Sequence, residues 1–503
     1  MLSKQLAARG LRQHAAAGLR CMSVDARSMS GAAANRDTTV YGQGAASTFT
    51  VEHKARCTMR DLGEKVAIPA VHKFSPPPRL LCGPGPGNAH PRVHAAMSLP
   101  QVGHLDPYFM ELMEDIKALL RYTYQTNNEF TVPVSGTGSA AMEACVANMV
   151  EPGDKILVGV NGYFGHRMIN MAQRYGGVPI AINKPWGEVF TYEEIKAAIE
   201  KHQPKIVGLI HAETSTGACQ PFDGVGELCR KNGAILIADC VTSISGVPLY
   251  IDEWGIDASY AGTQKALSCP PGVSPLTFGP RAMEKLMSRK TEVANWYLDM
   301  KMVASYIGGS TGGGPRSYHH TAPISMCYAM REALELVREE VSDILYLSHV
   351  FLVCVVEAKG VRRARRQPPT VCKVERRWDG LVGLIAAAGR APVRSRALTC
   401  SHACVRVSLC VCVARDQTLP VRWARHRDVA ETFWQELENM GLEPLVAYEH
   451  RLPTLTTIKV PPGVDAKKAV SYILEKYQIE IGNGLGDLAG KCWRIGAWAV
   501  ACG

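Results

Sequence analysis

The chain has 503 residues, more than one ordinary domain needs and enough to bury a large core. Hydrophobic residues make up 47% and charged residues 20%, close to the average for soluble globular proteins, and no apolar run is long enough to cross a bilayer. The formal net charge of +10 is concentrated in residues 1–60 (+6) and 341–421 (+8), which leaves −4 for the rest and excludes the basic face that nucleic-acid binding requires.

Residues 1–35 have the composition of an organellar targeting segment. The stretch has no acidic residue before Asp25 and is rich in Ala, Leu and spaced Arg, which predicts an amphipathic basic helix. We expect a mitochondrial transit peptide here, with a plastid or peroxisomal address or a disordered basic tail as alternatives. No secretory segment is present, so the 17 cysteines are expected to be reduced thiols. Residues 36–78 are polar and aperiodic, and we interpret them as a linker.

A large domain is expected over residues 79–340. Short apolar or β-branched runs alternate with helical patterns from Phe130 to Gly279, which predicts an α/β fold built of βαβ units around a mainly parallel sheet. The expected strands lie within residues 130–136, 154–160, 178–183, 205–213, 234–239 and 272–279. Ligands of such sheets bind beyond the carboxyl ends of the strands.

The turn from Ser135 to Ser139 follows the first of these strands and precedes a helical pattern. Backbone N–H groups at a helix start, the helix dipole and nearby hydroxyls together favour a phosphate group. A glycine-rich turn that holds no anion is an equally good interpretation of this segment alone.

Two ionisable residues follow later strands. Asp239 ends the apolar run 234–239, where a carboxylate needs a cation close by, although a helix cap or an arginine partner would also explain it. Lys265 stands among small and apolar residues. It is either a surface lysine with a buried stem or an amine whose pKa is lowered by burial, as nucleophilic catalysis requires.

The C-terminal third departs from this pattern. Residues 341–421 are basic and aperiodic and contain six cysteines, which fits a metal or redox module, a disordered insertion or the translation of a retained intron. Residues 422–503 predict a small α+β domain, with helices over 428–442 and 465–477 and a strand over 454–461, and with a truncated end.

The order of SGTGSAAMEA, NGYFGHR, HAETSTG, ADCVTSISGVPL, GTQKAL, SYHHTAP and RIG resembles class V, fold type I aminotransferases of the alanine- or serine-glyoxylate type. The likeness runs from about Leu80 to Glu340 and from about Trp423 to Gly496. It implies pyridoxal 5'-phosphate as cofactor, a large cofactor-binding domain with a small C-terminal domain, and a homodimer with shared active sites.

The resemblance also implies a role for individual residues. Lys265 would be the catalytic lysine that bears the cofactor, and Asp239 would hold the ring nitrogen of the cofactor. Other residues expected to contact the cofactor are Thr137, Gly138, Ser139, Phe164, Thr214, Val241 and Gln264, joined by Tyr318 and Thr321 of a second subunit. Arg494 would bind the substrate carboxylate, Gly85 and Asn88 would border the substrate entrance, and no metal is expected.

The implied reaction is transamination of alanine or serine with glyoxylate, giving pyruvate or hydroxypyruvate and glycine by ping-pong kinetics. Small amino acids and 2-oxo acids would be the ligands, and a role in photorespiration is also implied. Two alternatives stay open at this point: an inactive relative with a disrupted small domain, and another fold type I enzyme such as a cysteine desulfurase. Desulfurases typically have a His where Gln264 precedes Lys265.

Overall fold

The computed structural model describes residues 69–71, 73–307, 317–339 and 418–498. The chain divides into two units, residues 1–75 and 76–503, and every element described below belongs to the second. The predicted transit peptide lies outside the described residues, as do most of the linker and the six cysteines of residues 341–417.

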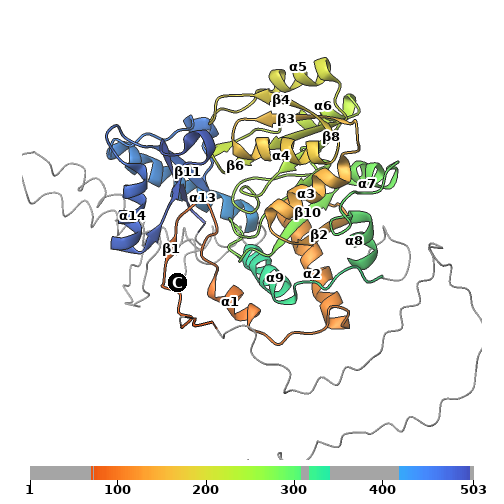
Figure 1. The fold of residues 1–503 in the computed structure, drawn as a ribbon, viewed down its shortest axis with the longest axis horizontal. Helices are drawn as coiled ribbons and strands as arrows, with labels where there is room; N and C mark the ends of the chain where they lie inside the picture. The colour runs from red at the N-terminus through yellow and green to blue at the C-terminus, as the bar shows by residue number, and fades with distance from the viewer. Residues whose placement is uncertain (1–68, 72, 308–316, 340–417, 499–503) are drawn as a thin grey trace, which may run out of the picture. The chain divides into compact units, whose positions relative to one another are not determined.

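The centre of the fold is a seven-stranded sheet (Figure 1). Its order is β2-β10-β9-β8-β5-β3-β4, and the neighbours β9, β8, β5, β3 and β4 pair in parallel, whereas β10 is antiparallel to both β2 and β9. The predicted, mainly parallel sheet is therefore confirmed. The strands are β2 (Phe130–Ser135), β3 (Lys155–Val160), β4 (Val178–Asn183), β5 (Ile206–Ile210), β8 (Ile235–Asp239), β9 (Ala258–Tyr260) and β10 (Val273–Phe278).

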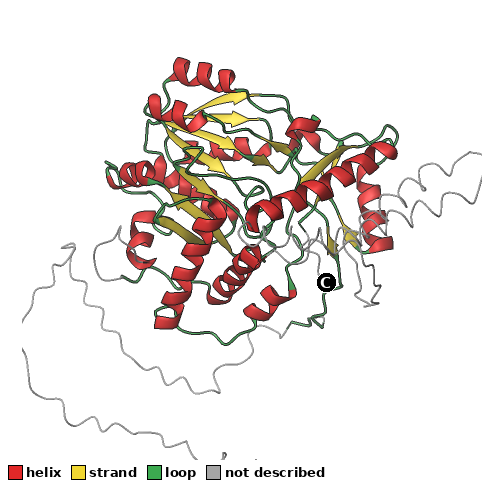
Figure 2. Ribbon diagram, turned by 180° about the vertical axis from the view of Figure 1, so that it is seen from behind, coloured by secondary structure: helices red, strands yellow, loops and turns green. Residues whose placement is uncertain are grey.

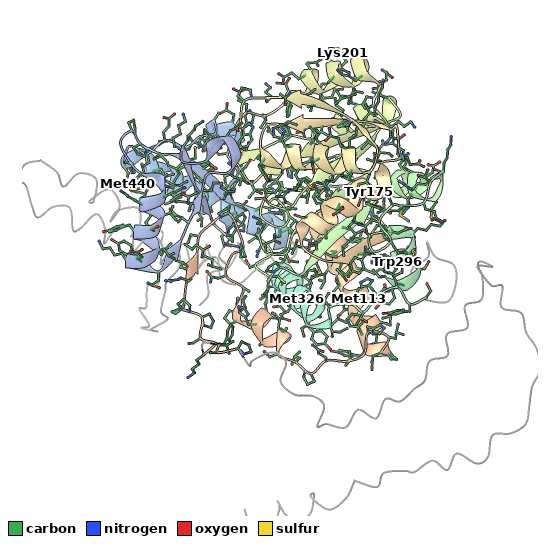
Figure 3. The ribbon with its side chains drawn as sticks, viewed as in Figure 1. Met113, Tyr175, Lys201, Trp296, Met326 and Met440 are labelled. Atoms are coloured by element: carbon green, nitrogen blue, oxygen red, sulfur yellow. The ribbon has the colours of Figure 1, made fainter. Side chains whose placement is uncertain are left out.

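Helices cover the sheet on both faces, and side chains fill the spaces between the layers (Figures 2 and 3). The central strands are buried along their whole length, as expected for strands covered from two sides. Several helices begin as the sequence dictates: Asp106 caps α2 ahead of Pro107, and Thr191 and Glu194 form a capping box at α5. The helices of this part are α1 (Pro91–Met97), α2 (Pro107–Tyr124), α3 (Gly138–Met149), α4 (Tyr163–Arg174), α5 (Tyr192–His202), α6 (Val225–Lys231), α7 (Pro280–Met287), α8 (Met300–Ile307) and α9 (Ile324–Glu339).

The C-terminal residues form a smaller α+β layer with its own apolar cluster, as predicted. A three-stranded sheet has the order β11-β14-β13, and β1 at the start of the described chain pairs in parallel with β12. Helix α13 begins ten residues before the predicted helix, within the expected insertion, because Leu419 and Trp423 are buried in the main core. The elements are β1 (Leu80–Leu81), α13 (Thr418–Asn439), β11 (Leu455–Lys459), α14 (Ala466–Tyr477), β12 (Ile479–Glu480), β13 (Gly482–Asn483) and β14 (Cys492–Gly496).

The described ranges contain eight cysteines, and all of them are unpaired. Burial raises the pKa of Cys240 and Cys269 to about 12, so these thiols are inert components of the core. Within the same ranges no cluster of three or more His, Cys, Asp or Glu side chains could bind a metal ion. None of the helices described is long and apolar enough to span a membrane.

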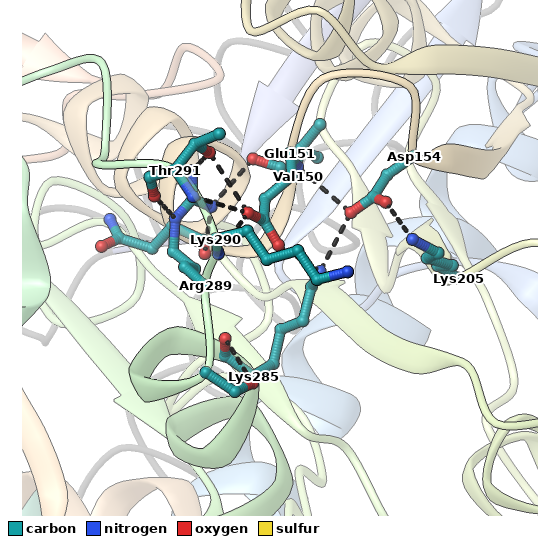
Figure 4. Close-up of polar contacts among 10 residues, drawn as sticks. Val150, Glu151, Asp154, Lys205, Lys285, Arg289, Lys290 and Thr291 are labelled. Carbon is teal, nitrogen blue, oxygen red and sulfur yellow. Dashed lines mark hydrogen bonds and ion pairs between the residues drawn. The ribbon is translucent and has the colours of Figure 1, made fainter.

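Charged residues at the amino ends of β3 and β5 form an ion-pair network (Figure 4). Asp154 is buried and accepts hydrogen bonds from Lys205 (2.5 Å) and Lys285 (3.0 Å). Glu151 accepts the backbone N–H groups of Lys290 (2.8 Å) and Thr291 (3.1 Å). Each carboxylate in this network therefore has cationic or N–H partners.

The network makes the pKa of Glu151 unusually low. Burial raises this pKa, but the N–H groups of Lys290 and Thr291 and the ammonium group of Lys285 outweigh burial and lower it to about 2. A carboxyl with a depressed pKa stabilises the fold above its unfolded pKa, and that contribution is lost as the pH falls towards 2.

We expect the Glu151→Gln variant to be less stable than the wild type by about 1–2 kcal/mol at pH 7, since the hydrogen bonds lose a charged acceptor. The deficit should shrink as the pH falls from about 4.5 to 2, where the wild-type carboxylate takes up a proton. Urea unfolding at several pH values measures this. Glu227→Gln, which removes an exposed charge paired with Lys231, is the control, and a Glu151→Gln deficit independent of pH would contradict the prediction.

Candidate active site

The turn between β2 and α3 presents several hydrogen-bond donors to solvent. Gly136 has a φ of +141°, and a Cβ atom there would lie 2.6 Å from the Cβ of Ala140, so only glycine fits. Thr137 is the N-cap of α3 but makes no side-chain cap hydrogen bond, and both Thr137 and Ser139 are exposed. Their hydroxyls and the first N–H groups of a 12-residue helix are therefore available to an anion.

Asp239 is buried at the carboxyl end of β8, with 2% of its surface exposed. One carboxylate oxygen accepts the Val241 N–H (2.9 Å) and the other accepts the Tyr260 hydroxyl (2.9 Å). Burial raises the pKa of Asp239 to about 6 even though these two donors and the positive charge of Arg167 lower it. A cation placed against this carboxylate would be strongly favoured.

Lys265 lies in the loop after β9, and 7% of its surface is exposed. Its ammonium group contacts the carbonyl oxygen of Pro84. Burial and the positive charge of Arg494 lower the pKa of Lys265 to about 7, against the opposing effect of Asp239. At neutral pH a large fraction of this lysine is therefore a free amine, the form that attacks carbonyl carbons and removes protons.

Gly85 allows the chain to pass close to Lys265. Its φ is +105°, and a Cβ atom there would lie 2.6 Å from the lysine Nζ. Asn88 at the end of the same turn accepts the Leu81 N–H (2.8 Å) and donates to the carbonyl of Arg79 (3.1 Å). In this structure Asn88 thus secures the turn, and its predicted role at the substrate entrance stays a prediction.

Gln264 contacts the Gly83–Gly87 turn, and Val241 lies beside the Thr137–Ser139 turn. The buried Oε1 atom of Gln264 has no partner among the described residues, and the main-chain oxygen of Gln264 accepts the Gly87 N–H (3.1 Å). A Cβ atom on Gly138 would lie 3.3 Å from a methyl group of Val241, so these two residues are in contact range. An unpartnered buried acceptor such as Gln264 Oε1 is a candidate ligand contact.

Phe164 lies at the start of α4 beneath an arginine. The guanidinium group of Arg167 is 4.6 Å from the centre of the Phe164 ring, and it donates a hydrogen bond to Ser139 (2.8 Å). Arg167 therefore adds positive charge beside the turn from Ser135 to Ser139. Arg167 was not predicted from the sequence, although its position three residues after Phe164 on a helix was a usable signal.

Glu213 is a second buried carboxyl of the site, and its role was not predicted from the sequence. It accepts the backbone N–H groups of Ser215 (3.0 Å) and Phe164 (3.2 Å) and the Ser215 hydroxyl (2.6 Å). Burial raises the pKa of Glu213 to about 7, although the Ser215 and Phe164 donors lower it. A carboxylate within HAETSTG, directly after a buried strand, was the available signal.

Arg494 extends from β14 of the smaller layer towards the strand-end loops of the main sheet. Its Nε donates to the carbonyl of Asn483 (2.8 Å) and one terminal nitrogen donates to the carbonyl of Thr214 (3.3 Å). Burial lowers the pKa of Arg494 to about 10, opposed by the charge of Glu213. The guanidinium is held in place and cationic, as a carboxylate-binding group should be.

The Thr214 hydroxyl contacts the Thr242 hydroxyl, so its side chain faces the end of β8. Tyr318 and Thr321, by contrast, lie on the segment before α9, where both are exposed and their hydroxyls are 3.5 Å apart. The described contacts do not connect either residue to Lys265 or Asp239. A role for them in a neighbouring subunit's site stays a prediction.

The geometry gathers a buried amine, a buried carboxylate, an anion-binding turn and an arginine at the carboxyl ends of the strands. A free amine can act as nucleophile and base, the carboxylate can hold a cationic ring, and the arginine can hold a carboxylate. This combination suits chemistry on an α-amino acid. Trp498, whose ring faces the ammonium group of Lys265, was not predicted from the sequence.

The chain is similar to known proteins over most of its length. The family described as aminotransferase class-V matches residues 91–345. An alanine–glyoxylate aminotransferase of Callithrix jacchus is 35% identical over 84% of this chain and 83% of its own. A (S)-ureidoglycine–glyoxylate transaminase of Bacillus subtilis is 30% identical over 85% and 87%. The crystal structure of an alanine–glyoxylate aminotransferase from Nostoc sp. has a TM-score of 0.67 and 44% identity, and it covers 86% of this chain and 94% of its own.

Proposed function

The chain belongs to the class V aminotransferase family, and from this premise we propose that it transfers the amino group of alanine or serine to glyoxylate. The products would be pyruvate or hydroxypyruvate and glycine. One observation supports this more than any other: Lys265 and Asp239 are buried together with shifted pKa values, in a chain similar to glyoxylate aminotransferases over 84% of its length.

The cofactor of this family is pyridoxal phosphate, and the residues present fit it. The exposed hydroxyls of Thr137 and Ser139 at the start of α3 suit its phosphate. Asp239 suits the protonated ring nitrogen, and the unpartnered Oε1 of Gln264 offers a further contact. When bound, the cofactor supplies the carbonyl that receives the amino group and the ring that withdraws electrons from the substrate.

The chain itself positions the substrate and moves protons. Arg494, fixed by the carbonyls of Asn483 and Thr214, would bind the α-carboxylate of an amino acid or oxo acid. Lys265, whose pKa of about 7 leaves a large fraction of it as free amine at neutral pH, is the base suited to take the proton from the substrate Cα atom. Asp239 would keep a proton on the ring nitrogen by remaining charged opposite it.

The experiment that tests the function is a comparison of amino donors. Purified protein supplied with pyridoxal phosphate is assayed with L-alanine, L-serine and (S)-ureidoglycine, each with glyoxylate as acceptor. We expect glycine to form with alanine or serine and double-reciprocal plots to be parallel, as in ping-pong kinetics. Turnover with ureidoglycine alone, or none with any donor, would contradict the proposal.

We expect the Arg494→Gln variant to have kcat/KM lower by about 10²-fold, mostly through a higher KM for both donor and glyoxylate, because the carboxylate loses a charged bidentate partner. Steady-state kinetics measures this. Arg281→Gln is the control, since Arg281 likewise donates to a backbone carbonyl, that of Ala234, but pairs with Asp257 and lies outside the site. Equal losses in the two variants would argue against a role in substrate binding.

Two alternatives lose support. Relatives at 34–35% identity are glyoxylate aminotransferases, and Gln264 rather than histidine precedes Lys265, so a cysteine desulfurase is not favoured. An inactive relative is not favoured either, because β14 and Arg494 are in place.

Location and assembly remain proposals. The basic, acid-poor composition of residues 1–35 supports mitochondrial delivery, which a fluorescent fusion of this segment would test. The 62% exposure of Tyr318 supports a homodimer in which a second copy covers it, which sedimentation would test. The role in photorespiration stays a prediction.

A further inference from the structure

The last described residues of the chain turn back onto the lysine loop. At the end of β14 the Gly496 N–H donates to the carbonyl of Cys82 (3.0 Å), and the next residue, Ala497, donates its N–H to the carbonyl of Thr454 (2.8 Å). These bonds direct Trp498, four residues after Arg494, into the interior, where only 1% of its surface is exposed.

Trp498 is hydrogen-bonded to both segments that enclose the lysine amine. Its indole N–H donates to the carbonyl of Gly83 (2.6 Å), and its main-chain oxygen accepts the Ser268 hydroxyl (2.9 Å). A Cβ atom on Gly87 would lie 2.7 Å from the Cβ of Trp498, so the turn approaches this closely because it has glycine there. Trp498 therefore joins the Gly83–Gly87 turn, through its indole, to the loop that follows Lys265, through its main-chain oxygen.

The ring of Trp498 also covers one side of the Lys265 amine. The Nζ atom of Lys265 lies 5.4 Å from the ring centre, over its face. The charged groups that act on this amine are Asp239 from β8 and Arg494 from β14. The side chain of Trp498 belongs to a buried apolar cluster, whose other members are Ala212, Val247, Ala266, Leu452 and Leu455.

We propose that Trp498 is a positioning residue for Lys265: its indole fastens the Gly83–Gly87 turn over the amine and excludes water from one side of it. Only the task of Lys265 in this proposal rests on the proposed function, whereas its enclosure by Trp498 does not. Burial is the main cause of the lowered pKa of Lys265, so a residue that keeps water out also keeps this amine neutral at the pH of catalysis.

The titration of Lys265 tests whether the Trp498 ring keeps water away from the amine. In the full-length protein freed of cofactor, the rate at which Lys265 reacts with an acylating reagent is followed against pH by mass spectrometry. We expect a midpoint near 7 in the wild type, and midpoints higher by about one pH unit in Trp498→Ala and Trp498→Leu, because water reaches the amine.

The matched control is Trp434→Ala. Trp434 is likewise 1% exposed and hydrogen-bonded through its indole N–H, to Thr456 (2.8 Å), but it belongs to a different apolar cluster, that of the smaller layer. Its variant should lose stability without moving the Lys265 midpoint. An unchanged midpoint in both Trp498 variants, or an equal shift in Trp434→Ala, would overturn the proposal.

The Trp498→Phe variant tests the fastening separately, since it keeps an aromatic ring but lacks the N–H donor. Hydrogen exchange of the cofactor-loaded protein should show the Gly87 amide, which donates to Gln264, exchanging about tenfold faster, as loss of one hydrogen bond allows. Unchanged exchange at Gly87 would overturn this part. Neither measurement needs a substrate, so a wild type inactive towards glyoxylate would refute the proposed function and leave this inference testable.

Discussion

Replacement of Lys265 by methionine is expected to lower kcat by about 10³-fold or more, since the substrate Cα proton then has no base. Methionine approximates the length of the lysine stem but cannot attack a carbonyl or accept a proton. The assay is glycine formation from alanine or serine and glyoxylate. Activity within tenfold of the wild type would refute the role assigned to Lys265.

The same variant should be more stable than the wild type when both are cofactor-free. The pKa of Lys265 is about 7 in the folded chain and 10.5 ordinarily, so between these values only the unfolded chain keeps the proton. The unfolding free energy of the wild type therefore rises with pH across this window. We expect Lys265→Met to be more stable by about 2–4 kcal/mol at pH 6, with the gap closing by pH 10.5.

Lys285→Met is the control for this comparison. Lys285 is also largely buried, but its ammonium bonds Glu151 (3.2 Å) and Asp154 (3.0 Å). Removing it leaves two carboxylates with fewer partners, so this variant should be less stable than the wild type at pH 6. Urea titrations of the two variants thus should shift in opposite directions.

Replacement of Asp239 by asparagine is expected to lower kcat by about 10²–10³-fold and to weaken retention of the cofactor, because a neutral amide cannot stabilise a cationic ring nitrogen. Asparagine keeps an oxygen for the Val241 N–H, so the backbone at the end of β8 should hold its position. Cofactor retention is measured by the absorbance that remains after dialysis. Full retention with normal turnover would contradict the role of Asp239.

Asp239→Asn should also stabilise the cofactor-free chain. The pKa of Asp239 is raised from 3.8 to about 6 by burial, so between these values only the folded chain keeps the proton and stability falls as the pH rises. Above pH 6 we expect the variant to be more stable by about 2–3 kcal/mol, and below pH 4 the two should converge. Asp154→Asn, which removes a carboxylate bonded to two lysines, should be destabilising at pH 7 instead.

The expected stability changes of these variants have opposite signs because the two ends of the sheet treat buried charges differently. At the amino ends of β3 and β5, Asp154 and Glu151 have lysine or N–H partners, and their pKa values are lowered. At the carboxyl ends, burial dominates, and the pKa values of Asp239 and Lys265 shift towards the neutral forms. The first arrangement stabilises the fold, whereas the second costs stability and supports catalysis.

Much of the fold could be predicted because its central strands are buried on both faces and appear as continuous apolar runs. The run 234–239 that became β8 is an example. β9 was missed because it has only three residues, and the antiparallel direction of β10 could not be foreseen because strand order is a long-range property. The start of α13 was missed because burial of Leu419 and Trp423 depends on the main core.

The residues of the site likewise divide into those that the sequence indicated and those that only the folded structure brought together. The sequence by itself singled out Lys265, Asp239 and the Thr137–Ser139 turn, because Asp239 and the turn stand at the ends of predicted strands and Lys265 stands within a short, distinctive motif. Only the tertiary structure decided that Arg494 bonds Thr214, that Arg167 bonds Ser139 and that Trp498 encloses the lysine. These contacts join residues from separate elements, in two cases more than 200 positions apart. Local patterns fix which residues end a strand, whereas burial and the resulting pKa shifts arise only when the layers pack together.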